Sequence, residues 1–192
     1  MDRIDALRIV YEYAHDFPVI STCGATSREW ASLGKKPNHL YVVDSMGLSP
    51  SIALGVSLAI EDKPIDKCIV LEGDGGILMN PNVLASAAYL EPEKWLCIVL
   101  DNECFASTGG QRSLAAKINI SSVASGYGVK TLTAENTEQF RQALIEALKV
   151  KEPVVIHAKI GSHNEKVDFI NDNPAVMAAE FTKYIVNKCE GV

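Results

Sequence analysis

The sequence lacks the features that mark several large classes of protein. Its 18 lysines and arginines are outnumbered by 24 aspartates and glutamates, which gives a net charge of -6. This balance argues against a nucleic-acid-binding surface. No apolar run reaches the roughly 20 residues that cross a bilayer, and residues 1–17 contain neither the apolar core nor the cleavage site of a signal peptide. We therefore expect a cytoplasmic protein with no nucleic-acid or membrane partner.

Cysteine pairs and metal-binding clusters are also missing. The five cysteines form no C-x-x-C pair, and Cys68 and Cys97 lie inside apolar, strand-like segments. An odd number of cysteines, scattered in this way, indicates reduced thiols that pack as small core residues. The four histidines show neither ligand spacing nor a triad partner, so the sequence does not indicate a zinc site.

The chain does contain a regular alternation of strand-like and helical segments. Valine- and isoleucine-rich segments predict strands at residues 18–22, 39–43, 67–72, 95–101, 129–133 and 153–160. Helical spacing covers 2–16, 44–60, the stretch from the glycine turn at 73–76 to about 90, 135–150 and 174–188. Such alternation predicts one α/β domain over residues 1–192, with a mainly parallel six-stranded sheet between two helical layers.

An aspartate interrupts the glycine turn that follows the third predicted strand. The stretch LEGDGGILMN (71–80) has the strand, turn and helix order of a phosphate cradle. Leu78 replaces the last glycine of the dinucleotide fingerprint, so that fingerprint is incomplete. Asp74 would repel a phosphate group unless a divalent cation lay between them. Backbone N–H groups of Gly75 and Gly76 could then hold the phosphate oxygens directly.

A second metal ligand is expected at the end of the next strand. Magnesium takes about six oxygen ligands, often one or two side chains plus substrate phosphates. Asn102 directly follows the strand at 95–101 and offers an amide oxygen without adding charge. The turn after it can direct the backbone carbonyl of Cys104 at the same ion.

These residues resemble the cofactor motif of the thiamine diphosphate-dependent enzymes. In that motif Gly-Asp-Gly is followed at a similar spacing by asparagine, as Gly73-Asp74-Gly75 here is followed after 26 residues by Asn102. The resemblance implies a thiamine diphosphate-binding fold, with thiamine diphosphate and Mg²⁺ as cofactors. It also implies that Asp74, Asn102 and the carbonyl of Cys104 bind the metal, and that Gly73, Gly75 and Gly76 contact the cofactor.

The resemblance extends to two further segments before the motif. DSMGLSPSIALGVSLA (44–59) resembles the segment that supports the bent cofactor, which implies a supporting role for Met46 and a backbone contact from Asp44. Plain core packing is the alternative for Met46, and the family often has glycine at the position of Asp44. CGATSRE (23–29) resembles the loop at the diphosphate end, which Gly24 would approach closely.

A hydroxyl group of the same loop would bind the diphosphate. The hydroxyl would be that of Thr26 or Ser27. The alternative is that either residue caps a helix instead. Thr108, in the S-T-G-G-Q run after the metal asparagine, is a further expected cofactor contact.

The chain is long enough for only one of the two domain types that such enzymes need. The glutamate that activates the cofactor is therefore expected on a separate pyrimidine-binding alpha subunit, in a hetero-oligomer with at least two copies of each subunit. The motifs resemble sulfopyruvate and phosphonopyruvate decarboxylases most, which implies decarboxylation of a small anionic 2-oxoacid. Basic residues expected to bind the substrate tail, each of which could equally be a solvated charge, are Arg28, Lys35, Lys36 and Arg112.

Three other functions remain open at this stage. One is an acetolactate synthase-like subunit, which a flavin would mark. Another is the small subunit of a 2-oxoacid oxidoreductase, although the cysteines lack the spacing of an iron–sulfur cluster. The third is a cofactor-binding regulatory module without catalysis.

Overall fold

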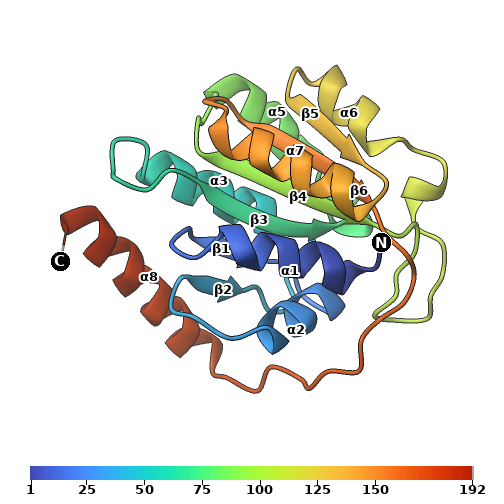
Figure 1. Cartoon of the computed structure of the whole chain (residues 1–192), viewed down its shortest axis with the longest axis horizontal. Helices are drawn as coiled ribbons and strands as arrows, with labels where there is room; N and C mark the ends of the chain where they lie inside the picture. Colours follow the sequence, from blue (N-terminus) through green and yellow to red (C-terminus); the bar gives the residue numbers. More distant parts are fainter. Residues whose placement is uncertain (192) are drawn as a thin grey trace.

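A single six-stranded sheet organises the computed structural model, which describes residues 1 to 191. Its strands are β1 (Val19–Ser21), β2 (His39–Tyr41), β3 (Cys68–Gly73), β4 (Trp95–Asp101), β5 (Lys130–Ala134) and β6 (Val154–Lys159). They lie in the order β2-β1-β3-β4-β6-β5, and every pairing is parallel (Figure 1). The α/β prediction and its six-stranded sheet are confirmed.

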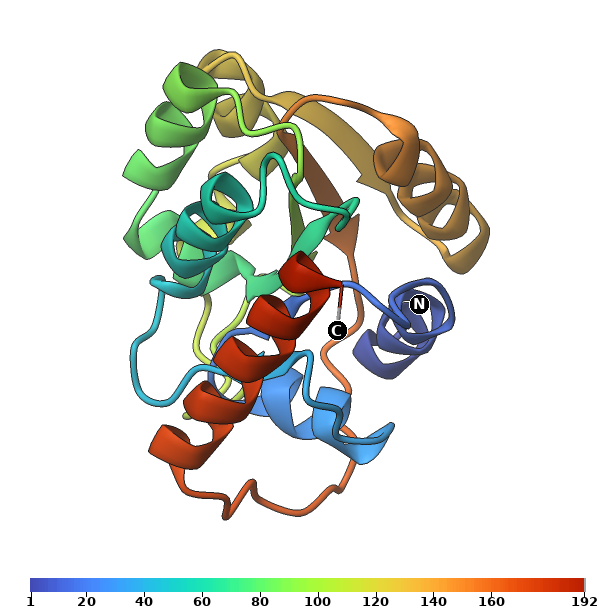
Figure 2. The ribbon, with the colours of Figure 1, turned by 90° about the vertical axis from the view of Figure 1, so that its left-hand side faces the viewer.

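Helices cover both faces of the sheet. They are α1 (Arg3–Tyr13), α2 (Ala25–Ser32), α3 (Ser49–Ala59), α4 (Asp74–Met79), α5 (Asn82–Leu90), α6 (Ile120–Gly126), α7 (Thr137–Lys149) and α8 (Pro174–Glu190). Residues of α1, α2 and α7 form one apolar core with the sheet, whereas α3, α4, α5 and α6 contribute to the other. Figure 2 shows α1 and α7 on one side of the sheet and α3 and α5 on the other.

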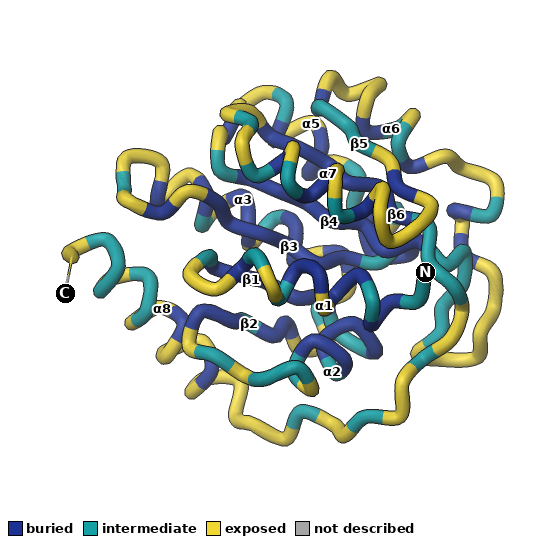
Figure 3. The backbone as a smooth tube through the Cα atoms, viewed as in Figure 1, coloured by how far each residue is buried: buried dark blue, intermediate teal, exposed yellow. Residues whose placement is uncertain are grey.

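The central strands are buried because helices pack on both of their faces. All seven residues of β4 are buried, and the buried colour runs along the middle of the sheet in Figure 3. Alternate side chains point to opposite layers: Leu96 and Ile98 belong to one core, and Cys97 and Val99 to the other. Cys68 and Cys97 are unpaired and fully buried, as predicted.

Two predicted boundaries are wrong. The helix expected from the glycine turn to about residue 90 is two helices, α4 and α5, which are interrupted at Asn80 and Pro81. Proline has no N–H to continue the helical ladder. The helix expected from residue 44 begins only at Ser49, and Asp44 adopts a positive φ of 55° in the turn before it. That conformation is favourable mainly for glycine.

The carboxyl ends of β1, β3 and β4 lie side by side because the three strands are parallel neighbours. The N-terminus reaches the same edge of the sheet, where the backbone N–H of Gly161 donates to the carbonyl of Met1 at 2.9 Å. The loops that leave these strand ends therefore meet the start of the chain.

Within residues 1–191, no helix has both the length and the apolar character to cross a membrane.

An aromatic cluster closes the β2 edge of the sheet. The rings of Trp30 and His39 have centroids 4.8 Å apart, and Tyr11 packs edge-on against Trp30 at 5.4 Å. His39 is 3% exposed. Burial, with a smaller contribution from the charge of Lys36, lowers the pKa of His39 from 6.5 to about 3. The imidazole is therefore neutral in the folded protein at ordinary pH.

His39 should make folding stability depend on pH. The unfolded chain takes up a proton at this residue below about pH 6.5, whereas the folded protein does so only near pH 3. Its contribution to stability is thus full above pH 6.5 and is lost as pH falls towards 3. His39→Phe should flatten the decline in the unfolding free energy between pH 6.5 and 4, as measured by urea denaturation. The exposed His15→Gln should keep the wild-type slope, and equal slopes in wild type and His39→Phe would contradict the assignment.

Candidate functional site

A small cavity lies at the carboxyl edge of the sheet, between the loops that follow β1, β3 and β4. Its volume is about 70 Å³, which leaves room for a few water molecules. Eight residues that the sequence predicts as cofactor or metal contacts line it: Thr26, Met46, Gly73, Asp74, Gly75, Gly76, Asn102 and Cys104. Predicted residues from four separate segments of the chain therefore line one cavity.

The other expected contacts lie elsewhere. Gly24, Ser27 and Asp44 line an adjoining cavity of about 340 Å³, which shares Cys23 and Ser107 with the smaller one. Thr108 lines neither of these cavities, because residues 104–112 fold back as a short hairpin and expose it at the tip. Its hydroxyl donates to Oε1 of Gln111 at 3.0 Å.

Asp74 is the first residue of α4, and its carboxylate is buried. It is 3% exposed, and its Oδ2 accepts a hydrogen bond from the hydroxyl of Ser113. Burial raises the pKa of Asp74, the bond from Ser113 lowers it, and the neighbouring charge of Asp101 raises it again, so that the net shift is upward. A cation beside Asp74 would reverse that shift.

The turn after β4 has a defined conformation. Oδ1 of Asn102 accepts from the backbone N–H of Cys104 at 3.2 Å, and Glu103 between them has a φ of 58°. Oδ1 of Asp101 accepts from the backbone N–H of Glu103 at 3.0 Å. Within residues 1–191, no donor bonds to the carbonyl of Cys104. The carboxylate of Asp74, the amide of Asn102 and this free carbonyl are the oxygen types that Mg²⁺ prefers.

A buried ionic network supports this turn, and sequence reasoning missed it. Oδ2 of Asp101 accepts from Nε2 of His157 at 2.7 Å and from Nζ of Lys159 at 2.6 Å. Burial raises the pKa of Asp101, but these two bonds, the bond from the Glu103 N–H and the charge of Lys159 together outweigh it, so that the pKa lies below its usual value. The register of β4 with β6 sets Asp101 opposite Lys159, and only that pairing brings these residues together.

The two glycines of α4 leave no space for a side chain. A Cβ at Gly75 would lie 2.2 Å from Cε1 of Phe105, and one at Gly76 would lie 2.3 Å from Oε1 of Glu72. Glu72 is 1% exposed and accepts from the hydroxyl of Ser49 at 2.5 Å. Internal packing therefore requires glycine at both positions, whether or not their backbone N–H groups also contact a phosphate group.

The loop after β1 is organised by its own hydrogen bonds. The hydroxyl of Ser27 donates to the carbonyl of Thr22 at 2.5 Å and lies 2.9 Å from Oγ of Ser21. Gly24 is the N-cap of α2, with a φ of 87° and no side-chain capping bond. The helix-cap alternative for Thr26 and Ser27 is therefore wrong. Thr26 keeps its place in the wall of the small cavity.

The basic residues expected near the substrate are engaged outside the small cavity. Arg28 lies over the ring of Phe169, Lys35 pairs with Asp172, Lys36 lies over the ring of Tyr11, and Arg112 pairs with Glu103. Among residues 1–191, Arg3 is the only basic residue in the wall of this cavity. The sequence around Arg3 does not distinguish it from a solvent-exposed residue in the first turn of a helix.

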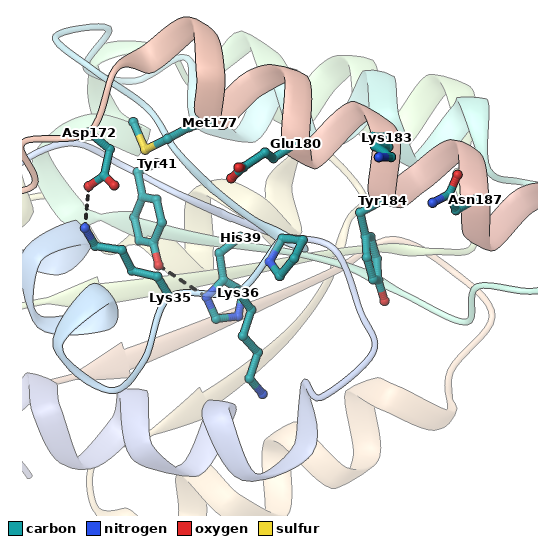
Figure 4. A pocket seen from close by; sticks show the side chains of 11 residues that line it. Lys35, Lys36, His39, Tyr41, Asp172, Met177, Glu180, Lys183, Tyr184 and Asn187 are labelled. Atoms are coloured by element: carbon teal, nitrogen blue, oxygen red, sulfur yellow. Dashed lines mark hydrogen bonds and ion pairs between the residues drawn. The ribbon is translucent and has the colours of Figure 1, made fainter. Parts of the chain in front are cut away.

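A larger cavity lies between α8 and the segment that leads into β2 (Figure 4). Its volume is about 510 Å³, and it shares no lining residue with the small cavity. Its lysines are partly engaged: Lys35 pairs with Asp172 and Lys36 lies over Tyr11. The small cavity holds eight of the predicted cofactor and metal contacts and the larger one holds none of them, so we assign the site to the smaller cavity.

Within the described residues, no group of three or more His, Cys, Asp and Glu side chains could hold a metal ion. A metal at the strand ends would thus need the mixed set of carboxylate, amide and carbonyl oxygens described above. The three residues that carry these groups line one cavity, and oxygen ligands of these types fit a hard divalent cation beside a phosphate group.

Comparison with known proteins identifies the family. The family model described as "Thiamine pyrophosphate enzyme, C-terminal TPP binding domain" matches residues 23–158. The chain belongs to this family. Thiamine pyrophosphate is another name for thiamine diphosphate, so the resemblance seen in the sequence is confirmed, as is its fold. The matched residues include the whole lining of the small cavity except Arg3 and Thr22.

Sequence relatives of two kinds match almost the whole chain. Sulfopyruvate decarboxylase subunit beta of Methanocaldococcus jannaschii is 35% identical over 95% of this chain and 96% of its own length. Phosphonopyruvate decarboxylase of Streptomyces viridochromogenes is 32% identical over 98% of this chain, which corresponds to 47% of that protein.

A solved structure agrees on the fold. Benzoylformate decarboxylase from Polynucleobacter necessarius superposes with a TM-score of 0.73 at 18% identity. The match covers 83% of this chain and 33% of that one, so this chain corresponds to about a third of that protein.

The contact between Gly76 and Glu72 can be tested by substitution. Gly76→Ala should lower the unfolding free energy by about 1–3 kcal/mol, because the new methyl group displaces a buried carboxylate. Gly55→Ala, in α3, has nothing within 4 Å of the added Cβ and should be neutral or stabilise by up to about 1 kcal/mol. In a Glu72→Ala background the cost of Gly76→Ala should shrink. An undiminished cost, measured by urea denaturation, would show that the contact is not responsible.

Proposed function

We propose that this chain is the diphosphate-binding beta subunit of a thiamine diphosphate- and Mg²⁺-dependent decarboxylase that converts sulfopyruvate to sulfoacetaldehyde and CO₂. The observation that supports it most is the convergence of Asp74, Asn102 and the free Cys104 carbonyl on one cavity at the strand ends. The alignment with sulfopyruvate decarboxylase subunit beta over nearly the full length of both chains supports the substrate.

Different residues of the cavity would bind different parts of the cofactor. Asp74, Asn102 and the Cys104 carbonyl would bind Mg²⁺, and the backbone N–H groups of Gly75 and Gly76 would face the diphosphate. When bound, the cofactor supplies the carbon that adds to the keto group and the ring that accepts the electrons. Met46, in the same wall, would support the bent cofactor, and its 36% exposure is compatible with a contact still to be made.

A partner chain would complete the enzyme. Sulfopyruvate decarboxylase of Methanosarcina acetivorans matches 94% of this chain, at 28% identity, with only 46% of its own length. A protein of that name is thus about twice as long as this chain. We infer that the missing half is a separate alpha subunit, which binds the pyrimidine ring and contributes the activating glutamate, in an assembly with at least two copies of each subunit.

Phosphonopyruvate decarboxylase is the second candidate. Its support is the 32% identity over 98% of this chain. Both substrates are small 2-oxoacids with a tetrahedral anionic tail, so the fold does not separate them. The five free cysteines fit a reducing compartment such as the cytoplasm.

Co-expression with a candidate pyrimidine-binding chain tests the proposal. CO₂ release would be measured with sulfopyruvate, phosphonopyruvate and pyruvate in the presence of Mg²⁺ and thiamine diphosphate. We expect kcat/KM to be highest for sulfopyruvate. A higher value for phosphonopyruvate would move the assignment to the second candidate. Cofactor binding without CO₂ release from any of the three would favour a regulatory module.

Substitution of the proposed metal ligand gives a sharper test. Asp74→Ala should weaken Mg²⁺-dependent cofactor binding by at least about 100-fold. Loss of a group that only supports a metal ligand typically lowers metal affinity by about 10–100-fold, and loss of the ligand itself should cost more. The circular dichroism spectrum and Tm should change little, because Asp74 is an ionisable group whose burial is itself unfavourable. Calorimetric titration would measure the affinity.

Two control variants show whether the loss of cofactor affinity is specific to Asp74. Ser113→Ala removes only the hydroxyl that bonds to Asp74 and should weaken binding less than Asp74→Ala does. The exposed Asp62→Ala should leave the affinity unchanged. Wild-type cofactor affinity in Asp74→Ala would reject the ligand assignment.

A further inference from the structure

Arg3 is a buried cation in the wall of the small cavity. It is the first residue of α1 and is only 4% exposed. The bond between Gly161 and Met1 holds this end of the chain at the carboxyl edge of the sheet. Of the residues from 1 to 191 that line the cavity, Arg3 alone is basic, whereas Glu72 and Asp74 are acidic.

The guanidinium group is held at one nitrogen. Nη1 donates to Oε1 of Glu29 at 2.8 Å and to Oδ1 of Asn164 at 2.6 Å. Glu29 lies on α2 and is 1% exposed, and the same oxygen accepts from the backbone N–H of Glu165 at 3.2 Å. Two elements distant in sequence, α2 and the segment after β6, therefore fix the position of one buried side chain.

Part of this group's bonding capacity is unused. A guanidinium has five N–H groups in a rigid fork, and the two on Nη1 are the ones engaged here. Within residues 1–191, neither Nε nor Nη2 of Arg3 has a hydrogen-bond partner, and Oε2 of Glu29 is buried without one. Nε and Nη2 of Arg3 are not among the buried atoms that lack a partner, so both stay accessible although the residue as a whole is buried. Because Arg3 lines the small cavity, these free N–H groups are available to a ligand there.

The charge balance of the cavity indicates which ligand. A diphosphate ester carries more negative charge than one divalent cation neutralises, and Asp74 adds a further negative charge beside it. A planar guanidinium matches the geometry of phosphate oxygens and can bind two of them at once. We propose that Arg3 binds the diphosphate group of the cofactor directly through Nε and Nη2, while Glu29 and Asn164 orient it. This inference rests on the proposed function.

The competing explanation is a purely structural ion pair between Arg3 and Glu29. Breaking a buried pair lowers stability, but it leaves no reason for an effect that depends on the phosphate groups of the ligand. The affinity for thiamine diphosphate relative to thiamine monophosphate, both with Mg²⁺, separates the two explanations. It would be measured by calorimetric titration of the chain together with its partner subunit.

Arg3→Met should weaken thiamine diphosphate binding by about 10- to 100-fold, the loss expected for charge-assisted hydrogen bonds. Binding of thiamine monophosphate should fall less, which would narrow the ratio of the two affinities. Arg3→Lys should give an intermediate loss, because an ammonium group keeps the charge but lacks the fork. Arg8→Met is the matched control, since Arg8 lies on the same helix with its side chain 58% exposed.

Glu29→Gln tests separately whether the negative charge of Glu29 matters for cofactor binding. The substitution removes the negative charge of Glu29 but keeps an oxygen that accepts from Nη1 of Arg3. The affinity for thiamine diphosphate should therefore stay within about threefold of wild type, even if Tm falls because the ion pair is lost. A folded Arg3→Met variant with the wild-type affinity ratio would overturn the inference. Should that variant not fold, an unchanged ratio in Arg3→Lys would overturn it equally. Failure of the wild-type complex to bind thiamine diphosphate at all would instead reject the proposed function.

Discussion

The parallel pairing of β3 with β4 is the constraint on which the rest of the site depends. Their register sets Gly73 opposite Leu100, so that Asp74 and Asn102 leave adjacent strand ends on the same edge of the sheet. A parallel pair directs its carboxyl ends to one side, whereas an antiparallel pair would separate these two residues by the length of a strand. Helices on both faces make the register stable, because a slip would expose a fully buried strand.

Around this pair of strand ends, the protein buries several charged side chains. Asp101 is held by His157 and Lys159 from β6, and Arg3 is held by Glu29 and Asn164. Isolated charges in such surroundings are strongly unfavourable, so each is paired or hydrogen-bonded. The networks hold the turn after β4 and the start of α1 against the cavity. The strand ends supply the residues that we propose face the cofactor, and neighbouring elements hold them in position.

The small volume of the cavity connects packing with binding. Phe105 lies against Gly75, and the carboxylate of Glu72 lies against Gly76. The backbone that would face a diphosphate is thus covered on one side by a ring carried on a hairpin. The hairpin itself is closed by the bridge between Cys104 and Arg112 and its flanking backbone bonds.

By itself the sequence determined the α/β class, the six strands and the metal-binding candidates, because these depend on local periodicity and on a motif that lies at consecutive strand ends. It did not reveal the roles of Arg3, Asp101, Phe105 and Glu72, nor the position of Thr108 outside the cavity. Strand order, the pairing of β4 with β6, and the contact between α1 and α2 bring these residues together or apart. Such contacts join segments many residues apart, and no pattern within a single segment encodes them.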